Sequence, residues 1–215
     1  MILIVAPSIT TETQSNFQPS KESHNMKPFL RGKKINIRHL SRADFAQYLS
    51  LSNDVSTMGE HWILSEVRTE ESLSAKFSGD GYFGDQGGRV LITDHTDRIV
   101  GVLAYFKPVF FWEAMELGCR IFLPSDHGKG YATEAVTIFA AFLFESKRIT
   151  RLQITADPAN IAANSVAKKA GFTLEGCIRQ ALFCRGKMRD QNLWSLLPDE
   201  GSHLSSLIKS AKDLV

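Results

Sequence analysis

The sequence has few cysteines and no excess of charge of one sign. Only three of its 215 residues are cysteines, and none of them forms a Cys-x-x-Cys pair: Cys119, Cys177 and Cys184. This usage favours free, buried thiols in a reducing compartment over a disulfide framework or a metal site, so we expect a cytoplasmic protein without a metal. The 25 lysines and arginines nearly balance 23 acidic residues, which leaves a net charge of +2. That balance predicts neither a nucleic acid nor an acidic membrane surface as a partner.

Long apolar runs and internal repeats are also missing. No segment has the length that a membrane span requires, and the apolar residues 2–6 lack the basic leader of a signal peptide. Residues 8–28 are rich in Ser, Thr, Asn, Gln and Lys and show no periodicity. We expect residues 1–28 to be a flexible arm, and Met26 to be an alternative start of translation. The remaining length suits one domain over residues 29–200, with residues 201–215 as its tail helix.

The apolar pattern of this domain predicts a mixed α/β fold. Alternating or continuous apolar segments predict strands at residues 35–38, 90–93, 99–106, 114–123, 151–156, 173–184 and 189–197. Helical patterns and cap residues predict helices at residues 41–52, 69–78, 133–146 and 161–170, the last ending at Gly171, and a tail helix at 202–213.

The most informative segment is residues 120–134. An apolar strand ends at Leu123, a polar loop carries Gly128 and Gly130, and an apolar helix is expected from about Thr133. Glycines at a helix entrance let backbone N–H groups converge, and the helix dipole adds partial positive charge. This arrangement predicts a phosphate or pyrophosphate site.

Two common nucleotide motifs do not match this loop. A Walker A loop requires Ser or Thr after Gly-Lys, but Gly130 follows Lys129 here. The dinucleotide pattern Gly-x-Gly-x-x-Gly has Thr133 in place of its third glycine.

The segment from His127 to Ala132 closely resembles the pyrophosphate motif of the GNAT superfamily of N-acetyltransferases, Gln/Arg-x-x-Gly-x-Gly/Ala. His127 stands where that family prefers Gln or Arg. Asn160 lies eleven residues before Gly171-Phe172, a spacing also found in the family. The end of the chain, with Glu175-Gly176, Arg179 and Gly186-x-x-Arg189-Asp190, resembles the ribosomal-protein-alanine N-acetyltransferase branch. The similarity covers roughly residues 33–198.

The resemblance implies a mostly antiparallel sheet flanked by helices, in which the fourth and fifth strands splay apart to admit acetyl-CoA. In that arrangement the Ile121 N–H polarises the thioester carbonyl and counts as catalytic. The resemblance, together with the glycine loop, implies the following cofactor-binding residues: Ile121, Phe122, Leu123, His127, Gly128, Lys129, Gly130, Tyr131, Ala132, Thr133, Asn160 and Lys169.

Glu116 is the predicted general base, acting through a water, as in relatives with Glu in this Glu-Leu-Gly position; a solvated strand carboxylate is the alternative. Trp62 is predicted to bind the acceptor with Glu116, although core packing explains a tryptophan equally well. The family's proton donors have no counterpart, because Ala163 and Ala167 occupy their positions.

The resemblance therefore predicts transfer of an acetyl group from acetyl-CoA to a primary amine by direct attack. The expected acceptor is a protein N-terminal α-amine, as in the ribosomal-protein branch. Two alternatives stay open: a small amine such as an antibiotic, polyamine or amino acid derivative, and a catalytically weak acyl-CoA sensor. We expect no nucleic acid or membrane partner, and either a monomer or a homodimer.

Overall fold

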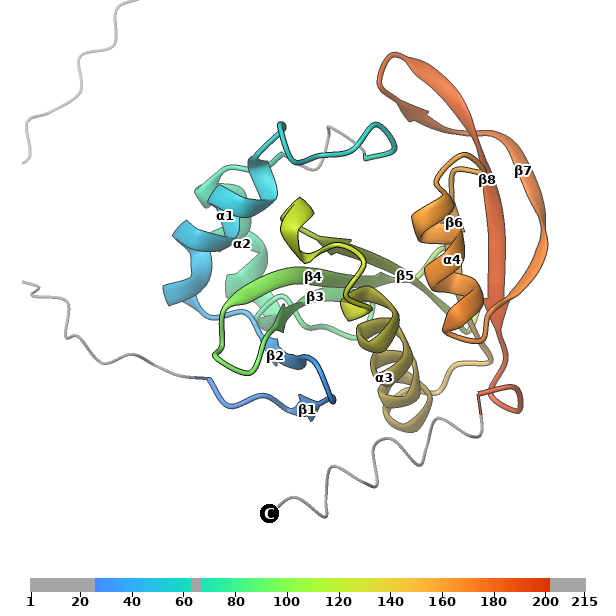
Figure 1. The fold of residues 1–215 in the computed structure, drawn as a ribbon. Coiled ribbons are helices and arrows are strands. Elements are labelled where there is room, and N and C mark those ends of the chain that lie inside the picture. The colour runs from blue at the N-terminus through green and yellow to red at the C-terminus, as the bar shows by residue number, and fades with distance from the viewer. Residues whose placement is uncertain (1–25, 63–66, 202–215) are drawn as a thin grey trace, which may run out of the picture.

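The strands of this chain build one mixed sheet with helices on both faces (Figure 1). The computed structural model describes residues 26–62 and 67–201. Most of the predicted arm and the predicted tail helix at residues 202–213 lie outside these ranges. The strands are β1 (Leu30–Arg31), β2 (Asn36–His39), β3 (Gly87–Thr93), β4 (Ile99–Phe106), β5 (Ala114–Ile121), β6 (Arg151–Ala156), β7 (Thr173–Cys184) and β8 (Lys187–Leu196). The helices are α1 (Phe45–Asn53), α2 (Glu70–Asp80), α3 (Tyr131–Ser146) and α4 (Ile161–Lys169), with single 3₁₀ turns at Arg42–Asp44 and Pro124–Asp126.

The strand order is β1-β2-β3-β4-β5-β6-β8-β7, and β5–β6 is the one parallel pair among the described strands. The predicted mixed, mostly antiparallel α/β fold is confirmed. The predicted fourth and fifth strands correspond to β5 and β6, because the two-residue strand β1 is too short to leave a pattern in the sequence.

Several boundaries differ from the prediction for local reasons. Helix α3 begins two residues earlier than expected, at Tyr131, because Gly130 takes a left-handed conformation (φ 83°) and serves as its N-cap. Strand β5 ends at Ile121 rather than Leu123, since Leu123 already precedes the 3₁₀ turn at Pro124. The turn between β7 and β8 is only Arg185-Gly186, both with positive φ, so β8 starts at Lys187 rather than residue 189. Ala170 is the C-cap of α4, and Gly171 (φ 91°) follows it.

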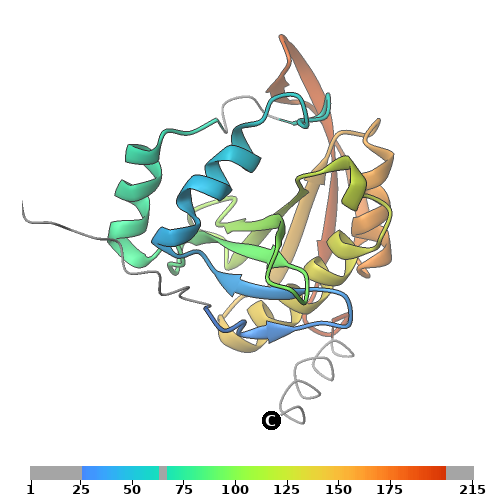
Figure 2. The same cartoon turned by 60° about the vertical axis from the view of Figure 1, so that its left-hand side comes forward.

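Two apolar cores lie on opposite faces of the sheet. On one face, Leu103, Tyr105 and Leu117 pack with Phe139 and Leu143 of the apolar helix α3. On the other face, Leu91, Val102 and Phe122 pack with Tyr48 of α1 and Leu73 of α2. Figure 2 shows α1 and α2 on the side of the sheet away from α4. Side chains alternate between faces along a strand, so neighbours such as Leu117 and Gly118 serve different layers.

The parallel pair β5–β6 separates after a short contact. Pairing joins residues 114–116 with residues 151–153 and then stops, although β5 continues to Ile121 and β6 to Ala156. Beyond that point β5 pairs only with β4, and β6 pairs only with β8. The predicted splay therefore exists, and it leaves one backbone edge of β5 without a strand partner.

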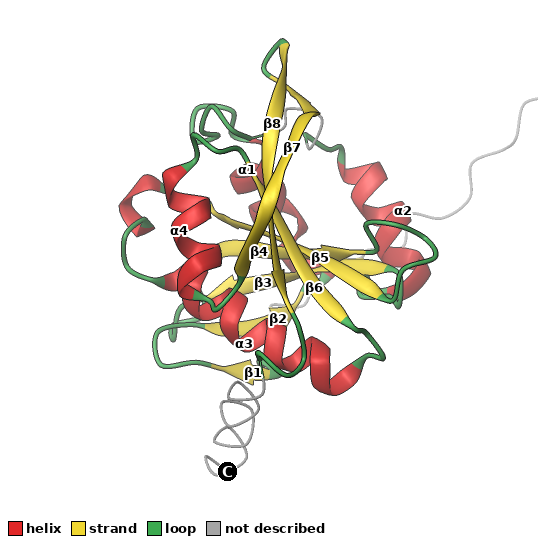
Figure 3. Ribbon diagram, turned by 90° about the vertical axis from the view of Figure 1, so that its right-hand side faces the viewer, coloured by secondary structure: helices red, strands yellow, loops and turns green. Residues whose placement is uncertain are grey.

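The last two strands form a long hairpin that rises above the rest of the sheet (Figure 3). Its outer strand β7 is a sheet edge and is exposed over most of its length. Pairing with β8 is irregular between Leu174 and Gly176 and again between Ile178 and Leu182. Gln180, inside the second of these stretches, has a positive φ of 49°. These irregularities bend and twist the hairpin.

Candidate active site

A cavity of about 700 Å³ lies where β5 and β6 separate. Its lining includes Glu116 and Gly118 of β5, residues 154–157 at the end of β6, and Asn160 at the start of α4. Ala132, in the first turn of α3, also lines it. Because α3 and α4 lie on one side of the sheet and the Gly118 face on the other, the cavity passes through the gap between the two strands.

Glu116 sits at the last paired position of β5, opposite Gln153. Both of its carboxylate oxygens accept hydrogen bonds from β6: one from Gln153 Nε2 at 2.8 Å and the other from Thr155 Oγ1 at 2.5 Å. The side chain is half-buried and lines the cavity. The two contacts fix a carboxylate at the point where β5 and β6 begin to separate.

The backbone of β5 beyond Glu116 presents alternate residues to the gap. The Phe122 N–H donates to Val100 O of β4, and the Phe122 side chain is fully buried in the core beside Tyr48. By alternation, the N–H and C=O groups of Ile121 point away from β4 toward the gap. Leu123 is also extended, but its carbonyl accepts the Asp126 N–H and its side chain packs against the core that contains Tyr48. Of the three predicted strand residues, Ile121 therefore faces the gap with both backbone groups, and Phe122 does not.

The glycine loop presents a run of N–H groups at the start of α3. Gly128 and Gly130 have φ of 74° and 83°, and no side chain caps the helix. The first helical bond runs from the Glu134 N–H to Gly130 O, and within the described ranges the N–H groups of residues 128–133 have no backbone acceptor. These donors and the helix dipole together fit a pyrophosphate.

A buried carboxylate holds this loop in place. Asp126 is 3% exposed and accepts two hydrogen bonds from Arg98, at 2.8 and 3.1 Å. The Lys129 ammonium lies 2.8 Å from the same carboxylate, so this residue, predicted to contact phosphate, forms an intramolecular ion pair here. The hydrogen bonds from Arg98 lower the pKa of Asp126 from 3.8 to about 2, assisted by Lys129 and opposed by burial.

His127 and Lys34 also reach the loop. His127 Nε2 lies 3.2 Å from Ile121 O, the carbonyl that faces the gap. Lys34 Nζ donates to Lys129 O at 2.9 Å, which places a second ammonium beside Gly130. Glu134, in the first turn of α3, accepts the backbone N–H groups of Lys33 and Lys34. The sequence analysis missed Lys34, because only the fold brings the β1–β2 turn to the loop.

Asn160 and Asn164 organise the start of α4. Asn160 caps the helix by accepting the Ala163 N–H at 3.0 Å, and it lines the cavity. Asn164 donates to the carbonyls of Asp157 and Asn160 and accepts from Asn192 and Trp194 of β8. Asn164 is therefore a structural link between α4 and β8, and no pattern in the sequence pointed to it.

Comparison with known proteins decides the family of this chain. The profile described as "Acetyltransferase (GNAT) domain" matches residues 34–173. The chain belongs to the GNAT acetyltransferase family. As a GNAT N-acetyltransferase, it uses acetyl-CoA as co-substrate and transfers the acetyl group to an amine.

Two bacterial relatives of this GNAT chain are named for different substrates. The ribosomal-protein-serine acetyltransferase of Escherichia coli K12 is 26% identical over 62% of this chain and 74% of its own. The spermidine N(1)-acetyltransferase of the same strain is 24% identical over 73% of this chain and 82% of its own. A solved RimL ribosomal L7/L12 α-N-protein acetyltransferase in complex with coenzyme A superposes with a TM-score of 0.65 at 20% identity, covering 80% of this chain and 98% of that one. The relatives thus share the fold and the reaction but differ in acceptor.

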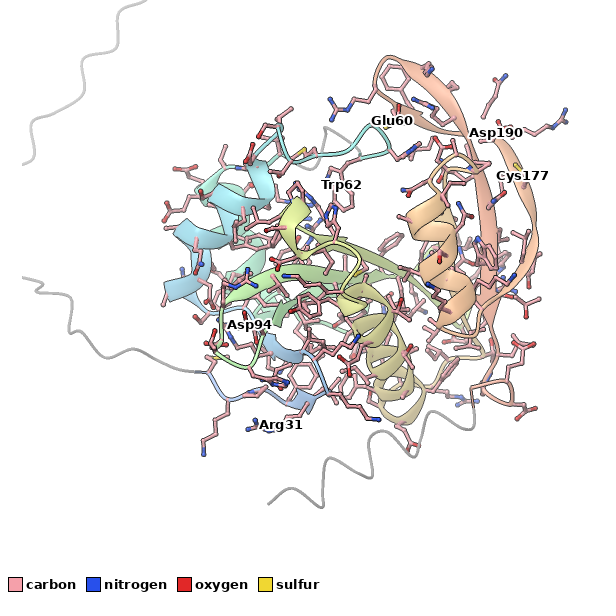
Figure 4. All side chains as sticks on the ribbon, in the orientation of Figure 1. Arg31, Glu60, Trp62, Asp94, Cys177 and Asp190 are labelled. Carbon is pink, nitrogen blue, oxygen red and sulfur yellow. The ribbon has the colours of Figure 1, made fainter. Side chains whose placement is uncertain are left out.

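Of the two remaining predicted site residues, Trp62 lines the cavity and Lys169 does not. Trp62 is half-buried and lines it, and Figure 4 shows this residue between the α1 side and the α4 side of the molecule. Its indole Nε1 is buried without a hydrogen-bond partner in the described part of the chain. Lys169 is exposed at the far end of α4 from Asn160 and does not line the cavity.

The cysteines and the missing proton donors complete the site. Cys119 lines the cavity, and burial raises its pKa to about 12. Cys177 is exposed on β7, away from the cavity (Figure 4). Ala163 lines the cavity and Ala167 is buried, and as alanines neither supplies a hydroxyl. Across the described residues, no group of three or more His, Cys, Asp or Glu side chains has metal-site geometry, and none of the helices meets the length and apolarity of a membrane span.

Proposed function

We propose that this GNAT enzyme acetylates the N-terminal α-amine of a peptide chain. The observation that carries the proposal is the position of Glu116, a carboxylate that Gln153 and Thr155 fix where β5 and β6 begin to separate. We assign Glu116 the removal of a proton from the incoming amine, through a water, on the side of the sheet that carries Gly118.

The backbone supports the proposed binding of acetyl-CoA. The N–H groups of residues 128–133 are assigned to the pyrophosphate, and Lys34 adds a positive charge beside them. The gap-facing groups of Ile121 are assigned to the pantetheine arm and the acyl carbonyl. His127 Nε2 lies 3.2 Å from Ile121 O, so the proposal requires the imidazole to move aside when that carbonyl binds the pantetheine arm.

The available base favours an α-amine over a lysine side chain. An α-amine of pKa about 7.7–8.0 is roughly one-tenth neutral at pH 7, whereas a lysine of pKa about 10.4 is neutral in only about 0.04% of molecules. Both oxygens of Glu116 already accept hydrogen bonds from β6, so each has less free lone-pair capacity to offer an incoming water. A substrate that is partly neutral in solution suits such a residue.

The absence of a hydroxyl at positions 163 and 167 leaves these positions without a proton donor, but direct attack does not require one. Acetyl-CoA supplies, when bound, an acetyl thioester whose thiol, of pKa about 8.5, leaves as a thiolate without obligatory protonation. The residues of the chain then have to orient the amine, exclude water and accept one proton. No covalent acyl-enzyme is required, and Cys119 is held as a thiol by burial, which raises its pKa.

A small-molecule amine is the second candidate. One relative is named a spermidine N(1)-acetyltransferase, and three carboxylates line the cavity of this chain: Asp80, Glu116 and Asp157. Asp157 is partly engaged, since the His61 ring lies 3.1 Å away and Arg189 lies 3.4 Å away. A catalytically weak acyl-CoA sensor is the third candidate, and it predicts cofactor binding without turnover.

The test is release of free coenzyme A thiol with a panel of acceptors. The panel contains peptides with a free N-terminal alanine or serine, N-blocked peptides with one lysine, aminoglycosides, and spermidine. We expect turnover of the free-N-terminal peptides and none of the N-blocked peptides. Turnover of spermidine or an aminoglycoside alone would establish the second candidate, and binding of acetyl-CoA without any turnover would establish the sensor.

A further inference from the structure

Arg120 is a buried cation in the cavity wall. Only 7% of the residue is exposed. Its guanidinium donates to Ser52 O at 2.8 Å and Thr57 Oγ1 at 3.1 Å, and it lies over the rings of Trp62 and Phe122 at 5.1 and 5.3 Å. All of these partners are neutral, and no carboxylate lies within 4.0 Å of Arg120 in the described part of the chain.

Another buried arginine of the same protein shows what is missing. Arg38 is 4% exposed, and its guanidinium is 2.8 Å from Asp44 and 2.7 Å from Asp97. A buried charge is costly unless an opposite charge accompanies it, and two carboxylates meet that requirement for Arg38. Arg120 bears the same cost without such a contact: burial lowers its pKa, and Tyr48 and the charge of Asp54 oppose that shift without forming an ion pair with Arg120 in the described part of the chain. An anionic group of a ligand would supply the opposite charge that the buried guanidinium of Arg120 lacks.

The sheet beneath Arg120 leaves room for such a ligand. Gly118 pairs with Ala104, and a side chain built on Gly118 would meet only the Ala104 methyl group, at 3.9 Å. Glu116 lies two residues before Gly118 and Arg120 two residues after it, so all three share one face of β5. The backbones of Glu116 and Arg120 are roughly 13 Å apart at about 3.3 Å per residue, and the two side chains cover part of that span. The floor is therefore small and open, with a carboxylate at one end and a guanidinium at the other.

We propose that Arg120 binds a carboxylate of the acceptor while Glu116 receives the amine of the same molecule. This inference rests on the proposed function and narrows it to amines that carry an acidic group a few bonds away. A peptide with Asp or Glu among its first residues has this chemistry, and so does a free acidic amino acid. The unpartnered Trp62 Nε1, within the described part of the chain, adds a donor beside the guanidinium. A polyamine has the opposite character, because its second ammonium would approach Arg120.

The experiment compares matched acceptors that differ only in charge. Peptides Asp-Ala-Ala-Ala and Asn-Ala-Ala-Ala, and peptides Ala-Glu-Ala-Ala and Ala-Gln-Ala-Ala, are assayed for kcat/KM with saturating acetyl-CoA, beside free aspartate, free glutamate and spermidine. We expect the acid of at least one pair to exceed its amide by about tenfold or more, as for one charge-assisted hydrogen bond. The difference should lie mainly in KM for the peptide.

Three variants assign the preference to Arg120. Arg120→Gln should bring the acid-to-amide ratio close to one without changing KM for acetyl-CoA, and Arg120→Lys should keep part of the ratio because it keeps the charge. Arg179→Gln removes one positive charge from exposed β7, outside the cavity lining, and should leave the ratio unchanged. If Arg120→Gln does not fold, the wild-type ratio and Arg120→Lys still decide the inference.

The outcomes separate the inference from the proposed function. Equal turnover of acid and amide peptides would overturn the role of Arg120 and leave N-terminal acetylation standing. Preference for free aspartate or glutamate over every peptide would support the carboxylate site and overturn the peptide acceptor. Turnover of spermidine alone would overturn both.

Discussion

Replacing Asp126 by asparagine tests whether the ion pair between this buried carboxylate and the half-exposed Arg98 under the glycine loop contributes to stability. The pKa of this carboxyl falls from 3.8 to about 2 in the folded protein, with Arg98 as the main cause. A shift of that size corresponds to about 2 kcal/mol of folding free energy, at about 1.36 kcal/mol per pKa unit. The amide in Asp126→Asn keeps the shape of the side chain but not its charge, so we expect the variant to lose about 2 kcal/mol at pH 7, or roughly 4–8 °C in Tm.

The sign of the pH dependence follows from the depressed pKa. Above the unfolded-state pKa of 3.8 the contribution of Asp126 is complete, and it disappears as the pH falls through the folded-state value of about 2. The difference between wild type and variant should therefore be constant from pH 7 to about pH 5 and decrease to roughly half by pH 3. Urea unfolding followed by circular dichroism at these pH values measures it.

A matched variant and a binding measurement complete this test. Glu145 is exposed on α3, and Glu145→Gln should change the free energy of unfolding by less than about 0.5 kcal/mol. Because Asp126 orders the loop that presents the free N–H groups, KM for acetyl-CoA should rise in Asp126→Asn alone. A stability difference that stays the same from pH 7 to pH 3, or that does not exceed the Glu145→Gln value, would refute the reasoning.

Three further predictions concern the site. Glu116→Gln should lower kcat/KM for a peptide amine by about 10²-fold or more at pH 7, with a smaller deficit above pH 9, where the amine is already neutral; an equal deficit at both pH values would argue against a base. Gly130→Val places a branched side chain at φ 83° with its Cβ 3.1 Å from Lys34 Nζ. Calorimetry should therefore show an affinity for acetyl-CoA reduced about tenfold or more. The control Gly79→Val has open space around its Cβ and should bind acetyl-CoA normally. Iodoacetamide at pH 8 should label exposed Cys177 before Cys119, whose pKa burial raises to about 12, and mass spectrometry showing the reverse order would contradict the placement of Cys119.

The sequence predicted those parts of the site that depend on local order. Gly128 and Gly130 at the start of an apolar helix mark the loop by themselves, because positive φ and close N–H groups are properties of a few consecutive residues. Glu116 was predicted through family resemblance, from its place in the Glu-Leu-Gly segment, and the structure places it in the cavity lining. The separation of β5 from β6 was predicted through family resemblance rather than from the apolar pattern.

The contacts that join distant segments could not be predicted from the sequence. Lys34 lies 95 residues from Lys129, to which it donates, and Arg120 lies 68 residues from Ser52. Their residue types carry no signal in isolation, since an arginine on a strand usually reaches solvent. Phe122 shows the opposite problem: its motif position suggested a cofactor contact, but the pairing of its N–H with Val100 turns it toward β4.

The irregular pairing of β7 also bears on how this protein avoids aggregation. The sheet has two edges, and β1 at one of them is only two residues long. The other edge, β7, exposes the apolar side chains of Leu174, Ile178 and Phe183, a pattern that invites another chain to add as a further strand. The two interruptions of the ladder, one between Leu174 and Gly176 and one around Gln180, twist this edge, so no straight row of backbone donors and acceptors is available to a neighbour. The same bends that shape the hairpin thus keep a long apolar edge from acting as a template for intermolecular β-pairing.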